Sequence, residues 1–171
     1  MNSSYVTDVM MFGIKLKNKK TNLLNAITIF FLIVFDQFSK YLIENNFNLY
    51  ESYELIRFLN ITFIVNYGFA FGIFNDPNSS QVLIMIIIMI IIIYLIFLLI
   101  QTQSTIIKIS FILILSGAIG NFIDRLLRGY VIDFIDLYIS NYHWPAFNFA
   151  DSYISIGFII IMITILSGKK I

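Results

Sequence analysis

The sequence predicts a mainly α-helical membrane protein: a bundle of four transmembrane helices with a small extracytoplasmic β-rich loop element. Of the 171 residues, 59% are hydrophobic and only 12% are charged. A soluble domain of this length could not bury so much apolar surface. Four long apolar stretches divide the chain, and lysines flank them. We therefore expect residues 1–171 to form a single integral membrane domain.

The composition also excludes several classes of function. The net charge is +1, and no basic stripe is available to cover nucleic-acid phosphates, so no nucleic-acid partner is expected. Cysteine is absent and His143 is the single histidine. Disulfides, a thiolate nucleophile and the usual cysteine or histidine zinc sites are therefore excluded. We expect neither a metal nor a cofactor.

The apolar stretches predict helices over residues 23–42, 82–100, 106–125 and 151–166. The second stretch has no charge and is long enough to cross about 30 Å of hydrocarbon. The first contains Asp36 and Lys40, and no small-residue cleavage site follows it. We therefore interpret it as a retained helix rather than a cleaved signal peptide.

Lysines predict the orientation of this bundle. Residues 1–20 form a basic leader, Lys108 follows the second helix, and Lys169 and Lys170 follow the fourth. All fall on one side of a four-pass topology, which should be cytoplasmic. Residues 43–81 are rich in acids and belong outside. Both termini are then cytoplasmic, and both long loops face outward.

The first outer loop has a pattern of its own. Residues 58–67 are rich in β-branched and aromatic side chains and predict a strand. Residues 66–68 suggest a turn, and residues 69–74 are apolar again. We favour a small sheet that caps the bundle; the alternative is an aromatic platform beside an acyl-chain substrate.

Two groups of polar residues fall on single helix faces. Asp36 and Lys40 are four residues apart, which predicts an ion pair that orients the first helix. In an alternative with less support, Lys40 would act as a general base for Ser39 or Ser116.

Asn121, Asp124 and Arg125 share one face at the end of the third helix. We expect Arg125 to compensate Asp124, because arginine can hold a carboxylate in a two-point contact. Asp124 would then be a scaffold rather than a proton shuttle.

Three further aspartates lie near the outer ends of the third and fourth helices. Asp133 has apolar neighbours that would raise its pKa if the loop is buried, whereas Asp136 is expected to face water. Asp151 follows Asn148 by three residues, as expected for a helix start with Asn148 as N-cap. Two carboxyl groups brought together could share a proton and act as an acid–base pair. The spacing does not show which two meet.

Four motifs occur in the order found in the bacterial lipoprotein signal peptidases (signal peptidase II), and the chain resembles this family from about residue 30 to residue 155. The motifs are Asp36-Gln37-Phe38-Ser39-Lys40, Asn66-Tyr67-Gly68-Phe69-Ala70-Phe71, Gly117 to Arg125 with Val131-Ile132-Asp133-Phe134, and Phe147-Asn148-Phe149-Ala150-Asp151.

The resemblance implies that Asp133 and Asp151 are the catalytic pair of an intramembrane aspartyl endopeptidase. It implies supporting or substrate-positioning roles for Asp36, Lys40, Asn66, Gly68, Asn121, Asp124, Arg125, Asn148 and Ala150. The expected substrates are prolipoproteins with a diacylglyceryl cysteine, cut just before that residue at the outer face of the bacterial cytoplasmic membrane. Membrane lipids are the other expected partners, and the enzyme is expected to be a monomer.

Two functions from other classes compete with this one. A metal-dependent lipid phosphotransferase could use Asp124, Asp133, Asp136 and Asp151 as magnesium ligands. A small transporter subunit could use acids as an ion path, but its acids should lie in mid-span, whereas most acids here lie near one end.

Overall fold

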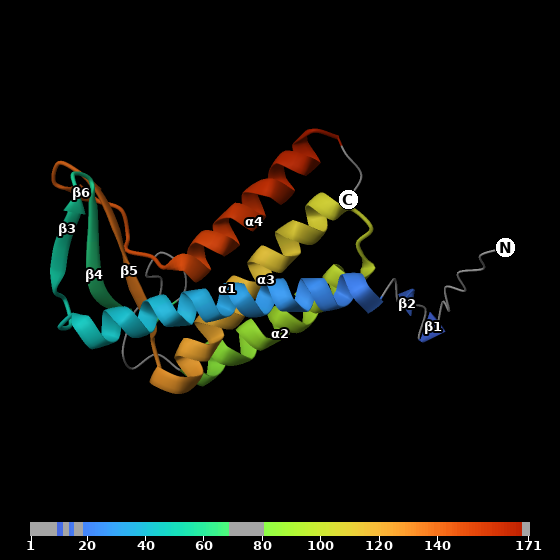
Figure 1. The fold of residues 1–171 in the computed structure, drawn as a ribbon, viewed down its shortest axis with the longest axis horizontal. Helices are drawn as coiled ribbons and strands as arrows, with labels where there is room; N and C mark the ends of the chain where they lie inside the picture. Colours follow the sequence, from blue (N-terminus) through green and yellow to red (C-terminus); the bar gives the residue numbers. More distant parts are fainter. Residues whose placement is uncertain (1–9, 12–13, 16–18, 69–80, 169–171) are drawn as a thin grey trace.

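A computed structural model describes residues 10–11, 14–15, 19–68 and 81–168 (Figure 1). The elements in chain order are β1 (Met10–Met11), β2 (Ile14–Lys15), α1 (Lys19–Asn46), β3 (Ser52–Ile56), β4 (Leu59–Asn66), α2 (Gln81–Gln101), α3 (Thr105–Arg128), β5 (Val131–Ile139), β6 (Tyr142–His143) and α4 (Phe149–Leu166).

The described part of the chain contains four helices long and apolar enough to cross a membrane, as the sequence predicted. Each helix extends beyond its predicted range, most of all α1 and α3. The extra turn of α3 ends at Gly129, whose φ of 80° is the left-handed conformation that glycine adopts readily. The N–H of Gly129 donates to the carbonyl oxygen of Arg125 at 3.1 Å and closes the helix.

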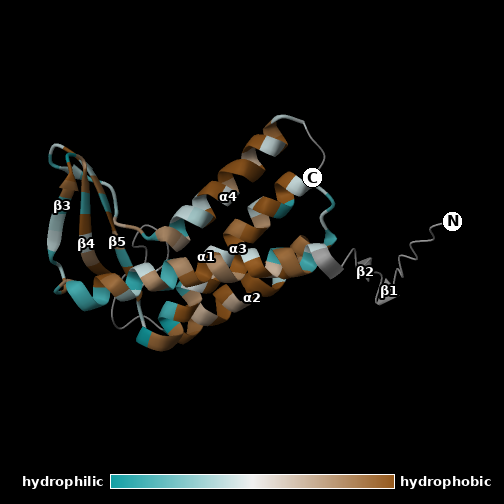
Figure 2. Ribbon diagram, in the orientation of Figure 1, coloured by the Kyte–Doolittle hydropathy of each residue, from teal (hydrophilic) through white to brown (hydrophobic). Residues whose placement is uncertain are grey.

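Helix α3 lies at the centre of the bundle and packs against α1, α2 and α4 (Figure 1). The start of α1 and the end of α4 lie far from the sheet, whereas α3 ends and α4 begins beside it. Most outward-facing helix residues are large and apolar, and polar residues gather at the end of the bundle near the sheet (Figure 2). Polar chemistry is therefore concentrated at one end of the bundle.

The sheet at that end has the antiparallel order β3-β4-β5-β6. Strand β4 corresponds to the predicted strand over residues 58–67. Strand β5 was not predicted, because residues 131–136 were assigned to a loop. In the structure its first four residues are all buried, and Ile132 and Phe134 pack with Phe63, Val65 and Ile43 under the sheet. The predicted apolar segment 69–74 lies outside the described residues.

Candidate active site

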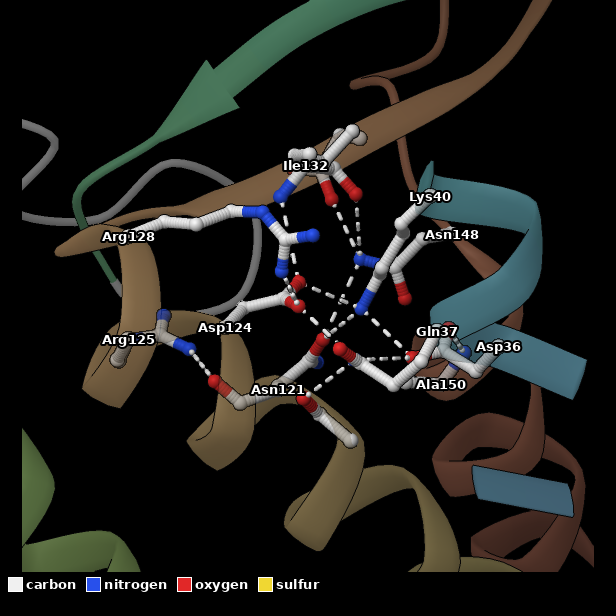
Figure 3. A network of polar contacts seen from close by, with 12 residues as sticks. Asp36, Gln37, Lys40, Asn121, Asp124, Arg125, Arg128, Ile132, Asn148 and Ala150 are labelled. Atoms are coloured by element: carbon white, nitrogen blue, oxygen red, sulfur yellow. Dashed lines mark hydrogen bonds and ion pairs between the residues drawn. The ribbon is translucent and has the colours of Figure 1, made fainter. Parts of the chain in front are cut away.

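Three buried charged side chains and the partly buried Arg128 connect α1 to α3, and we call Asp36, Lys40, Asp124 and Arg128 the charged cluster (Figure 3). Lys40 Nζ lies 2.8 Å from Asp36 Oδ2 and 2.8 Å from Asp124 Oδ2. Arg128 Nη1 contacts Asp124 Oδ1 at 3.0 Å. Asp36, Lys40 and Asp124 are fully buried, so their charges are balanced by one another rather than by water. The predicted ion pair between Asp36 and Lys40 is therefore present.

Further hydrogen bonds tie this cluster to its surroundings. Gln37 Nε2 donates to Asp124 Oδ1 at 2.9 Å and to the carbonyl oxygen of Gly120 at 3.1 Å. Asp36 Oδ1 accepts the backbone N–H of Ala150 at 2.9 Å. The charged cluster thus fixes the start of α4 as well as the α1–α3 contact.

Asp133 and Asp151, which we call the carboxyl pair, have different partners. Asp133 accepts hydrogen bonds from Asn148 Nδ2 at 2.7 Å and from Asn66 Nδ2 at 3.0 Å. Asp151 accepts one from Asn121 Nδ2 at 2.7 Å. Asn148 and Asp151 also form the predicted capping interaction of α4, in which each side chain bonds to the backbone N–H of the other. The hydrogen-bond donors found for both carboxyl groups in the described chain are neutral amides.

The carboxyl pair lines a cavity of about 700 Å³ together with Asn66, Asn121 and Arg125. The remaining walls are mostly apolar and come from the loop before α4 and from α4 itself. Burial, with the nearby charge of Asp151, raises the pKa of Asp133 from 3.8 to about 7. An acid of this kind can hold or release a proton near neutral pH.

Arg125 does not compensate Asp124, so that expectation is wrong. Its guanidinium donates to the carbonyl oxygens of Gly68 and Asn121, and it lines the cavity instead. Adjacent residues on a helix point in different directions, and Asp124 faces Lys40 and Arg128. Asp124 is charge-compensated as expected, but by other residues.

Asp136 does not face water, which corrects a second expectation. It lies on β5 with an 11% exposed side chain, 2.9 Å from His143 Nδ1. Asn60 Nδ2 also donates to it at 2.8 Å. Its contacts join strands β4, β5 and β6 and are separate from those of the carboxyl pair.

The geometry does not match two alternatives from the sequence, in which Lys40 is a general base for a serine or the aspartates bind a metal. Ser39 and Ser116 donate to backbone oxygens of Asp36 and Ile112 rather than to Lys40. Across the described ranges, no three His, Cys, Asp or Glu side chains are grouped to hold a metal ion.

Sequence reasoning gave no role to Gln37 or Arg128, although both contact Asp124. Arg128 stands four residues after Asp124, so the helical spacing could have identified it. Gln37 bonds to residues far along the chain, and its own sequence context gives no indication of them.

Comparison with known proteins gives consistent matches. A family model described as signal peptidase (SPase) II matches residues 28–167. A lipoprotein signal peptidase of Francisella tularensis subsp. novicida is 42% identical over 143 residues, which cover 81% of this chain and 89% of that protein. One from Thermodesulfovibrio yellowstonii is 42% identical over 135 residues, with 79% and 89% covered.

Two solved structures, each described as a bacterial membrane enzyme, have a similar fold. The first, at 2.3 Å resolution, gives a TM-score of 0.77 at 39% identity and covers 84% of this chain and 88% of its own. The second, at 1.9 Å resolution, gives 0.74 at 39% identity and covers 84% and 92%.

Proposed function

The chain belongs to the signal peptidase II family, and from this membership we propose that it is an aspartic endopeptidase acting on prolipoproteins. It removes the signal peptide by cutting before a diacylglyceryl-modified cysteine. One observation supports the catalytic type above all others. Two carboxyl groups, the buried Asp133 and the partly buried Asp151, line one cavity and are held by neutral amides.

In the proposed reaction, the carboxyl pair performs general acid–base catalysis. Asp151 is ionised and takes a proton from water, whose oxygen attacks the scissile carbonyl carbon. Asp133 is protonated and donates a hydrogen bond to the carbonyl oxygen, consistent with its pKa of about 7. The tetrahedral intermediate then loses the amine: as the carbon–nitrogen bond breaks, Asp151 gives the nitrogen the proton that it took from water and is ionised again.

The surrounding residues position this pair. Asn66 and Asn148 hold Asp133, and Asn121 holds Asp151. Asn66 Oδ1 also accepts the N–H of Gly68 at 2.9 Å. Arg125, fixed by the carbonyl oxygen of Gly68, supplies a cation at the cavity wall that can contact the substrate backbone.

The charged cluster is the scaffold for these residues. Asp36 accepts the N–H of Ala150 and so sets the start of α4. Lys40 pairs with Asp124 as well as with Asp36, so one ammonium group ties α1 to α3.

The charge pattern and the four apolar helices support the placement that we propose for the enzyme. The four helices lie in the cytoplasmic membrane with both termini cytoplasmic, and the sheet and carboxyl pair lie at the outer face. There the substrate cysteine, anchored by its acyl chains, can reach the cavity from the lipid. We propose a monomer in one integral domain, with prolipoproteins and membrane lipids as its partners.

Two other functions are not favoured by family membership. A lipid phosphotransferase would need Asp124 and Asp136 to join the carboxyl pair around a metal, but they have other partners. A transporter subunit would not explain the match to a peptidase family over residues 28–167.

The test is cleavage of a diacylglyceryl-modified prolipoprotein by the purified protein in detergent, followed as a shift on a gel. Wild type should cleave it, and Asp133→Asn and Asp151→Asn should not. EDTA should have no effect. Cleavage that survives in either variant would remove that residue from the catalytic pair, and sensitivity to EDTA would favour the metal-dependent alternative.

A further inference from the structure

We propose that Lys40 is a positioning residue for the cleavage reaction, and that it acts by fixing the orientation of the Asn121 amide against Asp151. This inference rests on the proposed function and deepens it. It assigns Lys40 a part in the reaction beyond holding α1 against α3.

The contacts form a chain from Lys40 to the carboxyl pair. Lys40 Nζ donates to Asn121 Oδ1 at 3.0 Å (Figure 3). Asn121 Nδ2 in turn donates to Asp151 Oδ1 at 2.7 Å. Lys40 is fully buried and Asn121 nearly so, which keeps water from replacing either partner.

The chemistry of these groups permits one orientation of the amide. An ammonium group can only donate hydrogen bonds, so the amide atom that faces Lys40 must be the oxygen. The NH₂ group then faces Asp151, whose ionised carboxylate can only accept. Reversal of the amide would put NH₂ against the ammonium and oxygen against the carboxylate. Both contacts would become repulsive.

A second donor also reaches Asn121, but its contact is weaker. Asn148 Nδ2 lies 3.3 Å from Asn121 Oδ1. The same NH₂ group, with two hydrogens, also serves Asp133 at 2.7 Å and the carbonyl oxygen of Ile132 at 3.2 Å. Asn148 therefore has little capacity left for Asn121, and the charged Lys40 is the main orienting group.

The position of Lys40 is itself fixed. Two carboxylates hold its ammonium at 2.8 Å each, from Asp36 and Asp124. Gly120 leaves the necessary space, because a Cβ there would lie 2.8 Å from Asp36 Oδ2. Lys40 is thus held in place before substrate binds, as a positioning group requires.

The charged cluster reaches Asp151 by two routes, which allows a decisive test. One route runs from Lys40 through the side chain of Asn121. The other runs from Asp36 to the N–H of Ala150, the residue before Asp151. A purely structural role for Lys40 would not depend on Asn121, whereas the positioning role would.

The experiment is a double-mutant cycle with Lys40→Met, Asn121→Ala and their combination, assayed for kcat and KM on the lipid-modified prolipoprotein. Each single change should lower kcat by about tenfold or more, with KM changed by less than about twofold. The combination should lower kcat no further than Asn121→Ala alone. Losses that multiply in the combination, or an unchanged kcat in Lys40→Met, would overturn the proposal.

Arg128→Met is the matched control, because Arg128 also pairs with Asp124 but has no contact with Asn121 among the described hydrogen bonds. Its kcat should remain within about twofold of wild type. An equal loss in this control would attribute the effect to the charge of Asp124 and overturn the proposal.

If Lys40→Met does not fold, the same cycle is run in an Asp36→Asn background. In that background Lys40→Met removes a cation whose partner Asp36 is already neutral, so no carboxylate of Asp36 is left unpaired. Asp124 retains its contact with Arg128. Failure of the proposed function and failure of the role of Lys40 give different results. Failure of wild type to cleave any lipid-modified substrate refutes the proposed function, whereas cleavage with multiplying losses refutes only the role of Lys40.

Discussion

Two pairs of aspartates lie at the same end of the bundle, and they differ in what surrounds them. Asp36 and Asp124 share the ammonium of Lys40, at 2.8 Å from each. Among the described residues, the carboxyl pair, Asp133 and Asp151, receives its hydrogen bonds from neutral amide N–H groups. All four side chains are largely removed from water, so burial alone does not separate them.

Under the proposed function, the different surroundings let one residue type serve either as scaffold or as reagent. A buried carboxylate beside a cation stays ionised, because protonation would leave the cation unpaired. A buried carboxyl group beside neutral donors can exist in either form near neutral pH. The charged cluster therefore suits a structural role, and the carboxyl pair suits proton transfer.

The strongest test of this contrast is whether variants of the carboxyl pair lose cleavage activity while they keep the stability of wild type. In Asp133→Asn and Asp151→Asn, cleavage should fall by about 10²–10⁴-fold, because each removes a proposed general acid or base. The thermal unfolding temperature in detergent should change little, because an amide of equal size replaces a buried acid. Unfolding that parallels the loss of cleavage would indicate that these residues are scaffold after all.

The opposite result is expected for the charged cluster. Asp124→Ala leaves Lys40 with one carboxylate and deprives Arg128 of a partner, which should cost about 3–5 kcal/mol of unfolding free energy. The loss should appear as a lower unfolding temperature and a lower yield of folded protein. Asp124→Asn, which keeps the volume, should lose less. A variant as stable as wild type would contradict the scaffold role.

The effect of pH sharpens the comparison further. The pKa of Asp133 is 3.8 in its ordinary state and about 7 in the fold, so the protonated form favours folding. The stabilisation that the protonated Asp133 gives the folded state is complete below pH 3.8. It decreases as the pH rises from 3.8 toward 7 and is absent above about pH 7. Between pH 5 and pH 8 wild type should therefore lose roughly 3 kcal/mol relative to Asp133→Asn.

Cleavage should also decline as pH rises above about 7, when Asp133 loses its proton. Unfolding temperatures and kcat across the pH range measure the two effects separately. Parallel stability curves for wild type and Asp133→Asn would contradict the raised pKa.

The sequence predicted the parts of this protein that depend on local pattern. The four helices follow from apolar stretches, and strand β4 follows from its β-branched and aromatic residues. Strand β5 was missed because both faces of residues 131–134 are buried, so no alternation of apolar and polar residues marks it.

The site depended on long-range contacts that local patterns do not contain. The choice of Asp133 with Asp151 came from the family resemblance, not from spacing. Asp124 was assigned to Arg125 because they are neighbours, whereas its partners are Arg128 one turn later and Lys40 on another helix. Helical spacing could have identified Arg128, but only the fold brings Lys40 to Asp124.

A smaller effect is expected where α3 meets the start of α4. A Cβ on Gly117 would lie 2.2 Å from the carbonyl oxygen of Ala150, so Gly117→Ala must push the two helices apart. We expect a loss of about 1–3 kcal/mol in stability and a larger fall in kcat than in Asp124→Asn, since Asp151 follows Ala150. Gly168→Ala, at the far end of α4, is the control for kcat alone, because the φ of 68° at Gly168 strains an alanine there as well; equal kcat values in the two glycine variants would contradict this expectation.

The smallest effect should come from Asp136, three residues after Asp133 on the same strand. Asp136 bonds to His143 and Asn60 and joins the strands rather than lining the cavity. Asp136→Asn should therefore keep kcat within a few-fold of wild type and lose about 1 kcal/mol of stability from the altered hydrogen bonds. Asp136→Asn and Asp133→Asn change the same side chain in the same way on the same strand. A difference in kcat between them therefore reports the surroundings of each carboxyl group. A loss of cleavage in Asp136→Asn as large as in Asp133→Asn would mean that position on the strand, and not contact with the cavity, determines the effect.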